Sequence, residues 1–149
     1  MSQLSDYKDC LKRRLLRKVE PSENKGRDSL KKAEEWIDEA SKNKTVSAYD
    51  SCISSSYMVM FHSARAILFR DGVSEKSHFC IARYLEKYVE KNLLEEKWVF
   101  LLDRIRDIRH MDQYSLHHSA TEEESISALN SAKDFFKRMK KLFNETEKL

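Results

Sequence analysis

Glycine and proline are scarce in this chain of 149 residues, which contains two glycines and one proline. An all-β sandwich or barrel needs a turn roughly every 8–12 residues and usually places one of these residues in each turn. The two glycines, Gly26 and Gly72, are too far apart to build a glycine-rich phosphate-binding loop. The composition therefore excludes nucleotide-binding loops of that kind, nearly excludes an all-β fold, and argues against an α/β fold.

Long apolar runs and paired cysteines are also missing. The longest run without a charged residue covers residues 51–64 and contains five serines, so it is too short and too polar to span a bilayer. The polar, charged N-terminus does not resemble a signal peptide. Cys10, Cys52 and Cys80 are isolated and odd in number, which supports neither a disulfide framework nor a zinc knuckle. We therefore expect free buried thiols in a cytoplasmic protein without a membrane span.

The charge of the chain is nearly balanced. Charged residues make up 36% of the sequence, and 28 basic against 25 acidic residues leave a net charge of +3. This mild excess permits nucleic acid as a partner without arguing for it. The hydrophobic fraction of 40% is enough for one packed core, and the abundant charge is typical of solvated helix faces.

Apolar residues recur at helical spacing in six segments. Pro21 and Gly26 follow the first segment, and Asp71-Gly72 is a natural end for the third. Thr121, followed by three glutamates, predicts a capping box at the start of the last. Short loops between long helices imply antiparallel neighbours, so we predict an all-α, up-and-down bundle of four or five helices with an extra N-terminal helix. The expected helices cover about residues 2–19, 27–41, 47–70, 74–90, 94–113 and 121–144.

This pattern divides the chain into two parts. Residues 1–25 form a basic helical extension, and residues 26–149 form the bundle domain. The basic run 12–18 in the extension predicts a solvated face, with binding of RNA or an acidic partner as the alternative. Residues 57–61 in the third helix are apolar on every side, which predicts a helix that is central or is covered by a second subunit.

The fifth predicted helix carries charge on its apolar face. That face is formed by Leu101, Leu102, Ile105 and Ile108. Continuing the helix places Arg109 and Asp112 on the same face, where an unpaired charge is costly. Two interpretations remain open at this point. The two residues form a structural ion pair, or Arg109 belongs to an anion site and binds a phosphate.

The five histidines have different expected roles. His117 and His118 fall in a loop and should be exposed to solvent. His62, in the central helix, should be a hydrogen-bonded packing residue, and His78 should cap or pack locally at the start of the fourth helix. His110 follows the candidate arginine and is the best-placed general base.

Metal-ligand spacing is weak in this sequence. Glu75 and His78, and Asp107 and His110, have the spacing of half-motifs in a di-iron bundle. Such a bundle needs two inward-facing Glu-x-x-His pairs and two further glutamates. Asp107 is predicted to face outward, so we predict no metal and no other cofactor.

Three segments resemble small stand-alone HEPN-domain proteins of archaea and bacteria. Residues 56–65 read SYMVMFHSAR and resemble the YYAMFHAAR segment of that family. Residues 76–78 resemble its K-T-H, and residues 109–114, RHMDQY, resemble its R-x-x-A-D-Y. Their order and spacing agree over about residues 27–144, so the chain is similar to a HEPN domain over most of its length.

The resemblance implies a helical bundle that forms a homodimer. Many HEPN domains are metal-independent ribonucleases, often toxins restrained by a partner nucleotidyltransferase, and their signature is an arginine followed after four to six residues by a histidine at the dimer cleft. Arg109 matches the arginine, whereas Tyr114 stands at the histidine position. A tyrosine, with a pKa of about 10, is a poor base at neutral pH. Arg104 and His110 have the right spacing but lie about 120° apart on a helix.

Two functions follow from these observations. In the first, a cytoplasmic HEPN homodimer binds RNA or a nucleotide phosphate through Arg109 and Asp112. As a ribonuclease of a toxin–antitoxin system, it would use Arg109 for the phosphate and His110 or Tyr114 for proton transfer. In the alternative, the bundle is a non-catalytic module that docks a nucleotidyltransferase partner, and the tyrosine in place of histidine favours this alternative.

Overall fold

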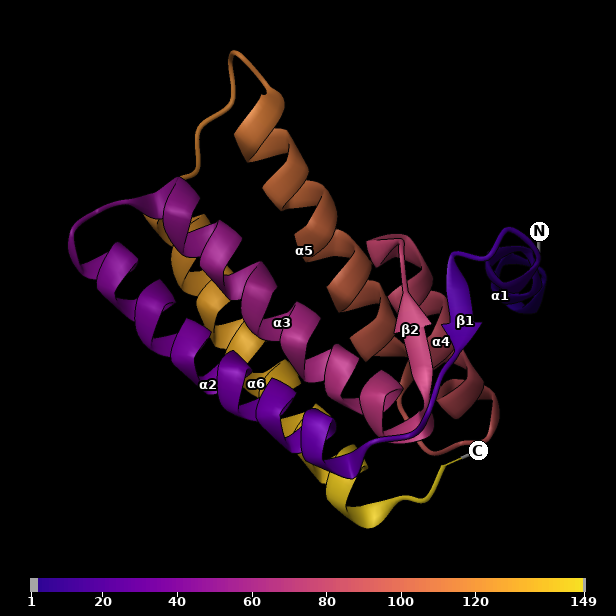
Figure 1. The fold of residues 1–149 in the computed structure, drawn as a ribbon. Coiled ribbons are helices and arrows are strands. Elements are labelled where there is room, and N and C mark those ends of the chain that lie inside the picture. Colours follow the sequence, from indigo (N-terminus) through magenta and orange to yellow (C-terminus); the bar gives the residue numbers. More distant parts are fainter. Residues whose placement is uncertain (1–2, 149) are drawn as a thin grey trace.

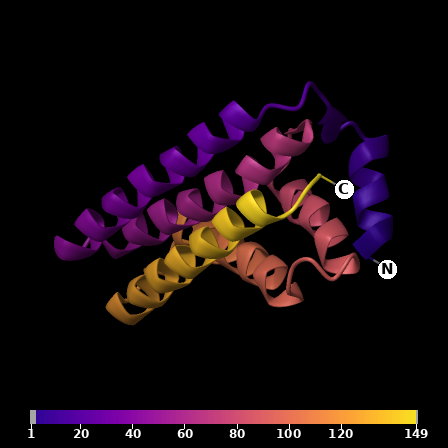
Figure 2. The same cartoon turned by 90° about the horizontal axis from the view of Figure 1, so that it is seen from below.

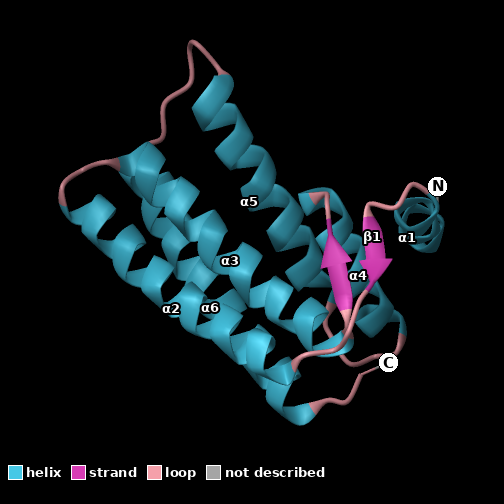
Figure 3. Cartoon of the chain, viewed as in Figure 1, coloured by secondary structure: helices cyan, strands magenta, loops and turns pink. Residues whose placement is uncertain are grey.

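The computed structural model describes residues 3–148, which form six helices and two short strands (Figure 1). The strands have three residues each, so the all-α prediction is confirmed (Figure 3). None of the described helices is both long and apolar enough to cross a membrane. The elements are α1 (Gln3–Lys12), β1 (Leu16–Lys18), α2 (Glu23–Thr45), α3 (Tyr49–Asp71), β2 (Val73–Glu75), α4 (His78–Glu90), α5 (Glu96–Tyr114) and α6 (Glu122–Glu145).

Helix α3 lies at the centre of the bundle and packs against α2, α4, α5 and α6. Seen from below, α2, α3 and α6 lie side by side (Figure 2). The middle turns of α3 are buried on every side, as Tyr57, Val59, Met60 and Phe61 show. The prediction of a central third helix is therefore confirmed, and the other helices of the same chain cover it.

The ends of the helices follow the local sequence. Gly72 ends α3 in the left-handed conformation, with φ of +81°, and Thr121 begins α6 with the predicted capping box. Helix α2 begins earlier than predicted, because the side chain of Ser22 accepts the backbone N–H of Lys25. Gly26 consequently lies inside α2, where a side chain would collide with α3 and α6.

The N-terminal segment differs most from the prediction. The helix expected over residues 2–19 ends at Lys12, and Arg14 turns the chain with a positive φ of 57°. Leu16–Lys18 then form β1, which pairs antiparallel with β2 and places Leu16 opposite Glu75. A partner strand some 60 residues away in the sequence overrides the local helical pattern.

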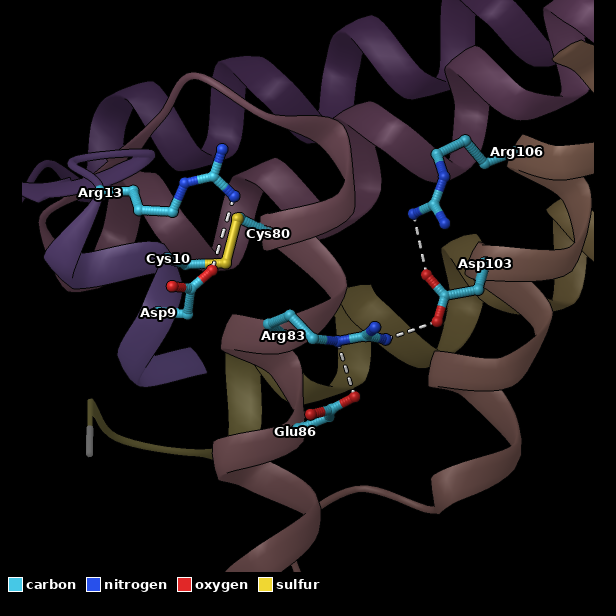
Figure 4. Close-up of a disulfide and its surroundings, with 8 residues drawn as sticks. All are labelled: Asp9, Cys10, Arg13, Cys80, Arg83, Glu86, Asp103 and Arg106. Atoms are coloured by element: carbon cyan, nitrogen blue, oxygen red, sulfur yellow. Dashed lines mark hydrogen bonds and ion pairs between the residues drawn. A yellow bond between two sulfur atoms is a disulfide. The ribbon is translucent and has the colours of Figure 1, made fainter. Parts of the chain in front are cut away.

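A disulfide joins Cys10 of α1 to Cys80 of α4 (Figure 4). The expectation of free thiols is therefore wrong for these two cysteines, while Cys52 is free and buried as predicted. The two cysteines are 70 residues apart in the sequence, so no local sequence motif indicates the bond. Tyr7 also packs on Tyr84, with ring centroids 6.2 Å apart. The N-terminal helix is thus attached to the bundle both covalently and by packing.

Candidate functional site at the end of α5

A chain of ion pairs attaches α5 to α4 before the candidate site begins. The Arg83 guanidinium on α4 contacts Glu86, 2.8 Å away, and also Asp103 on α5, which in turn lies 2.8 Å from Arg106 (Figure 4). The Arg83 and Glu86 side chains are almost completely buried. Asp103 thus joins α5 to α4, because α4 supplies Arg83.

Arg109 lies half-buried one turn beyond this network. Its guanidinium carbon stands 4.8 Å from the centroid of the Tyr57 ring on α3, a cation–π distance. Within residues 3–148 it forms no ion pair, and its buried Nε has no hydrogen-bond acceptor. Of the two interpretations that the sequence left open, the ion pair between Arg109 and Asp112 is thus not formed in the described chain. A guanidinium without a carboxylate partner is available to an anion.

The Tyr57 ring beneath Arg109 is itself held in place by His78. Its hydroxyl is hydrogen-bonded to Nδ1 of His78, 2.9 Å away, and the two rings stack. Burial raises the pKa of Tyr57 to about 12, against the opposing effect of Arg106 and Arg109. Burial, reinforced by the nearby arginines, lowers the pKa of His78. Tyr57 is therefore a neutral, oriented platform at neutral pH, and the packing role predicted for His78 is confirmed.

Arg109 lines a cavity of about 470 Å³ between α2, α3 and α5. Trp36 of α2 also lines it, and the buried indole N–H of Trp36 has no acceptor among the described residues. Two carboxylates share the cavity, and one of them, Asp50, accepts the backbone N–H of Ala120 at 2.7 Å. The cavity thus places the Arg109 side chain, which has no ion-pair partner in the described chain, beside two carboxylates. Its lining residues are Trp36, Asp50, Ser51, Ser54, Ser55, Met58, Arg109, Asp112 and Gln113.

Asp112 faces the connection between α5 and α6. Its side chain is fully buried, and Nε2 of His118 lies 2.8 Å from its Oδ1. Burial raises the pKa of Asp112, with the His118 imidazole opposing that effect. His117 is exposed as expected, whereas His118 is only partly exposed because it turns back toward Asp112.

His110 and Tyr114 lie elsewhere on α5. Both are exposed, and their rings contact each other with centroids 4.7 Å apart. They line a separate depression of about 480 Å³ with Asp107, Met111 and Ser115. Within a single chain, the structure therefore brings Arg109 and Asp112 into one cavity and His110 and Tyr114 into another.

The remaining candidate histidine, His62, packs edge-on against Phe61, with ring centroids 5.0 Å apart. Burial lowers its pKa to about 4, and nearby Arg65 and Lys32 act in the same direction. The Ser29 hydroxyl donates a hydrogen bond to the backbone carbonyl of His62. The imidazole ring of His62 has no hydrogen-bond partner in the described part of the chain. The packing role is as predicted, but the hydrogen bond is made by the backbone.

Sequence reasoning missed three residues of this region: Tyr57, Trp36 and His118. Tyr57 lies in the segment that resembles HEPN domains, and that resemblance could have singled it out. Trp36 belongs to an ordinary amphipathic stripe, and His118 to a polar loop, so nothing near them in the sequence indicates these contacts.

A helical bundle with an arginine near the end of α5 agrees with the fold that the sequence resemblance implied. Residues 27–142 match the HEPN domain family. This match covers well over half of the chain, so the protein belongs to the HEPN family.

Two archaeal proteins show the relationship in more detail. A "UPF0332 protein" of Archaeoglobus fulgidus is 27% identical over 116 residues, which cover 78% of this chain and 93% of that protein. A protein of Methanocaldococcus jannaschii named "Putative toxin MJ0605" is 28% identical over 98 residues, covering 65% of this chain and 72% of its own length. The chain is thus similar to a protein that carries a toxin name.

Proposed function

We propose that this HEPN protein binds single-stranded RNA through a phosphate at Arg109 and acts as the toxin of a cytoplasmic toxin–antitoxin pair. The observation that carries the proposal is the Arg109 guanidinium, which stacks on Tyr57 without an ion-pair partner in the described chain. Arg109 lines an open cavity between α2, α3 and α5, where a phosphate could reach the guanidinium. The toxin name of a relative supports the biological role.

The proposed reaction is transfer of the RNA phosphate from the 5′-oxygen to the neighbouring 2′-oxygen. The 2′-hydroxyl attacks phosphorus while a base on the protein takes its proton, and the 5′-oxygen leaves and receives a proton. Arg109 stabilises the negative charge that develops on the phosphate oxygens. His110 or Tyr114 would exchange the protons.

A homodimer is part of this proposal. The depression that contains His110 and Tyr114 is exposed and partly apolar, with Met111 54% and Tyr114 67% exposed. Leu116, just beyond the end of α5, is 93% exposed. A second copy docked on this end of α5 would cover these side chains. It would also add a second pair of His110 and Tyr114 side chains to the assembly. Within a single chain, these two side chains lie apart from Arg109.

The test is binding and cleavage of end-labelled single-stranded RNA by the wild type and by Arg109→Ala. Arg104→Ala is the matched control, because Arg104 is exposed on the same helix away from the cavity. We expect Arg109→Ala to weaken binding and to lower the slope of log K against log salt by about 0.7, the value of one phosphate contact on a single strand. Circular dichroism should show unchanged helicity. Failure of the wild type to bind, or equal losses in both variants, would contradict the proposal.

A non-catalytic docking module is the second candidate function. The separation of His110 and Tyr114 from the Arg109 cavity favours it, because no single chain assembles a complete acid–base site. In this case the exposed end of α5 would bind a nucleotidyltransferase. A complex with a nucleotidyltransferase is expected for both candidates, so the RNA assay separates them. Wild-type protein that forms this complex on co-expression but neither binds nor cleaves RNA indicates a docking module, and Tyr114→Arg, which places a charge in the contact, should then abolish the complex.

A further inference from the structure

Asp112, His118 and Glu124 converge from three consecutive parts of the chain. Asp112 lies in the last turn of α5, His118 in the connection, and Glu124 in the first turn of α6. One ligand atom from each lies within 4.8 Å of the others. Nε2 of His118 is 2.8 Å from Oδ1 of Asp112 and 3.7 Å from Oε2 of Glu124.

Asp112 is unsatisfied in this cluster. Its side chain is fully buried, and neither carboxylate oxygen has a hydrogen bond of acceptable geometry among the described residues. Nearly all buried polar groups in proteins are hydrogen-bonded, so each exception calls for an explanation. The short contact with His118 reaches one oxygen only. Asp112 therefore presents a buried carboxylate with the His118 imidazole beside one oxygen and no cation beside the other in the described chain.

The charge around the cluster is mainly negative. Asp50 lines the same cavity as Asp112, and Glu124 belongs to the same cluster. The imidazole is one group among three carboxylates, and its side chain is 34% exposed. Such a site is stabilised by a cation that several of these groups can share.

Two neighbouring contacts hold the ligands in position. Oε1 of Glu124 accepts the backbone N–H of Thr121 in the capping box at 3.3 Å, and Oε2 is the oxygen on the His118 side. Asp50 fixes the connection through the N–H of Ala120. Hydrogen bonds of this kind, made by ligands and by the loop that carries them, orient metal ligands in proteins.

We propose that Asp112, His118 and Glu124 bind a divalent first-row transition-metal ion, with Zn²⁺ as the representative case. One imidazole and two carboxylates form a nitrogen–oxygen set that suits such ions, whereas Mg²⁺ and Ca²⁺ prefer oxygen ligands alone. With three protein ligands, the ion would keep a coordination position for water. It would also cross-link the end of α5 to the start of α6. The proposal does not depend on RNA binding.

The experiment uses the untagged, metal-stripped chain and Zn²⁺ alone as the probe, because a histidine tag would itself bind the ion. Calorimetric titration should give one Zn²⁺ per chain. Thermal unfolding with Zn²⁺ at about 100 times its Kd should raise Tm by about 5–10 °C. His118→Gln and Glu124→Gln should each weaken binding at least about tenfold. Glu124→Gln keeps the carbonyl oxygen that the capping box needs.

His117→Gln is the matched control, since His117 is the exposed neighbour of His118 and lies outside the cluster. It should bind Zn²⁺ as the wild type does. No Zn²⁺ binding, wild-type affinity in His118→Gln, or equal affinity for Mg²⁺ would each overturn the proposal. The two variants alter partly exposed side chains, so a folded protein remains available even if changing the fully buried Asp112 unfolds the chain.

Discussion

Removing the disulfide by Cys10→Ser should destabilise the whole bundle and not only detach α1. The bond joins residues 70 positions apart, and the loop between them contains all of α2 and α3. In the chain-entropy treatment, closing such a loop lowers the conformational entropy of the unfolded chain by about 15 cal/mol/K. The bond therefore stabilises the folded chain by about 4 kcal/mol at 25 °C. At roughly 2–4 °C per kcal/mol for a chain of this size, Tm should fall by about 8–16 °C.

The assay is urea unfolding of the wild type and Cys10→Ser, each with and without a reductant. The wild type should lose stability on reduction, whereas Cys10→Ser should not respond. Alkylation of the denatured, unreduced wild type should modify Cys52 alone, since it is the free cysteine. Three modified cysteines before reduction, or equal stability of variant and wild type, would refute the reasoning. Because disulfides are rare in a reducing cytoplasm outside hyperthermophiles, the thiol count of protein from its own cells also tests the predicted location.

Two further predictions concern packing and pH. Gly26→Ala should destabilise the fold by about 1–3 kcal/mol in urea unfolding, because the new methyl group would stand 2.9 Å from the Ala66 carbonyl oxygen; the exposed Lys25→Ala is the control, and a stabilised Gly26→Ala would contradict the close approach. His62 has a pKa lowered from 6.5 to about 4. Between these two pH values, His62 is therefore protonated in the unfolded chain and neutral in the folded chain. The free energy of unfolding should therefore fall as pH falls through this window. His62→Gln should flatten the dependence of this free energy on pH, whereas the control His117→Gln should leave it unchanged. The same pH dependence in His62→Gln and the wild type would contradict the burial of His62.

Most of the fold could be predicted from the sequence, because its signals are local. The scarcity of glycine and proline, the helical spacing of apolar residues, and the caps at Gly72 and Thr121 each depend on residues within a turn or two. The apolar run at 57–61 predicted the central helix for the same reason. The placement of Arg109 and Asp112 on the inner side of α5 also followed from helical geometry alone.

Only the tertiary structure decided which residues meet. Pairing of β1 with β2, the bond between Cys10 and Cys80, and the contact of His118 with Asp112 all join residues that no local pattern relates. The same holds for Tyr57 beneath Arg109, since α3 and α5 are distant in sequence. Helical periodicity states which side of a helix is buried, but the partner on that side depends on how whole helices pack. The sequence therefore determined the helices and the inward charge, and the packing determined the cavity and the candidate metal ligands.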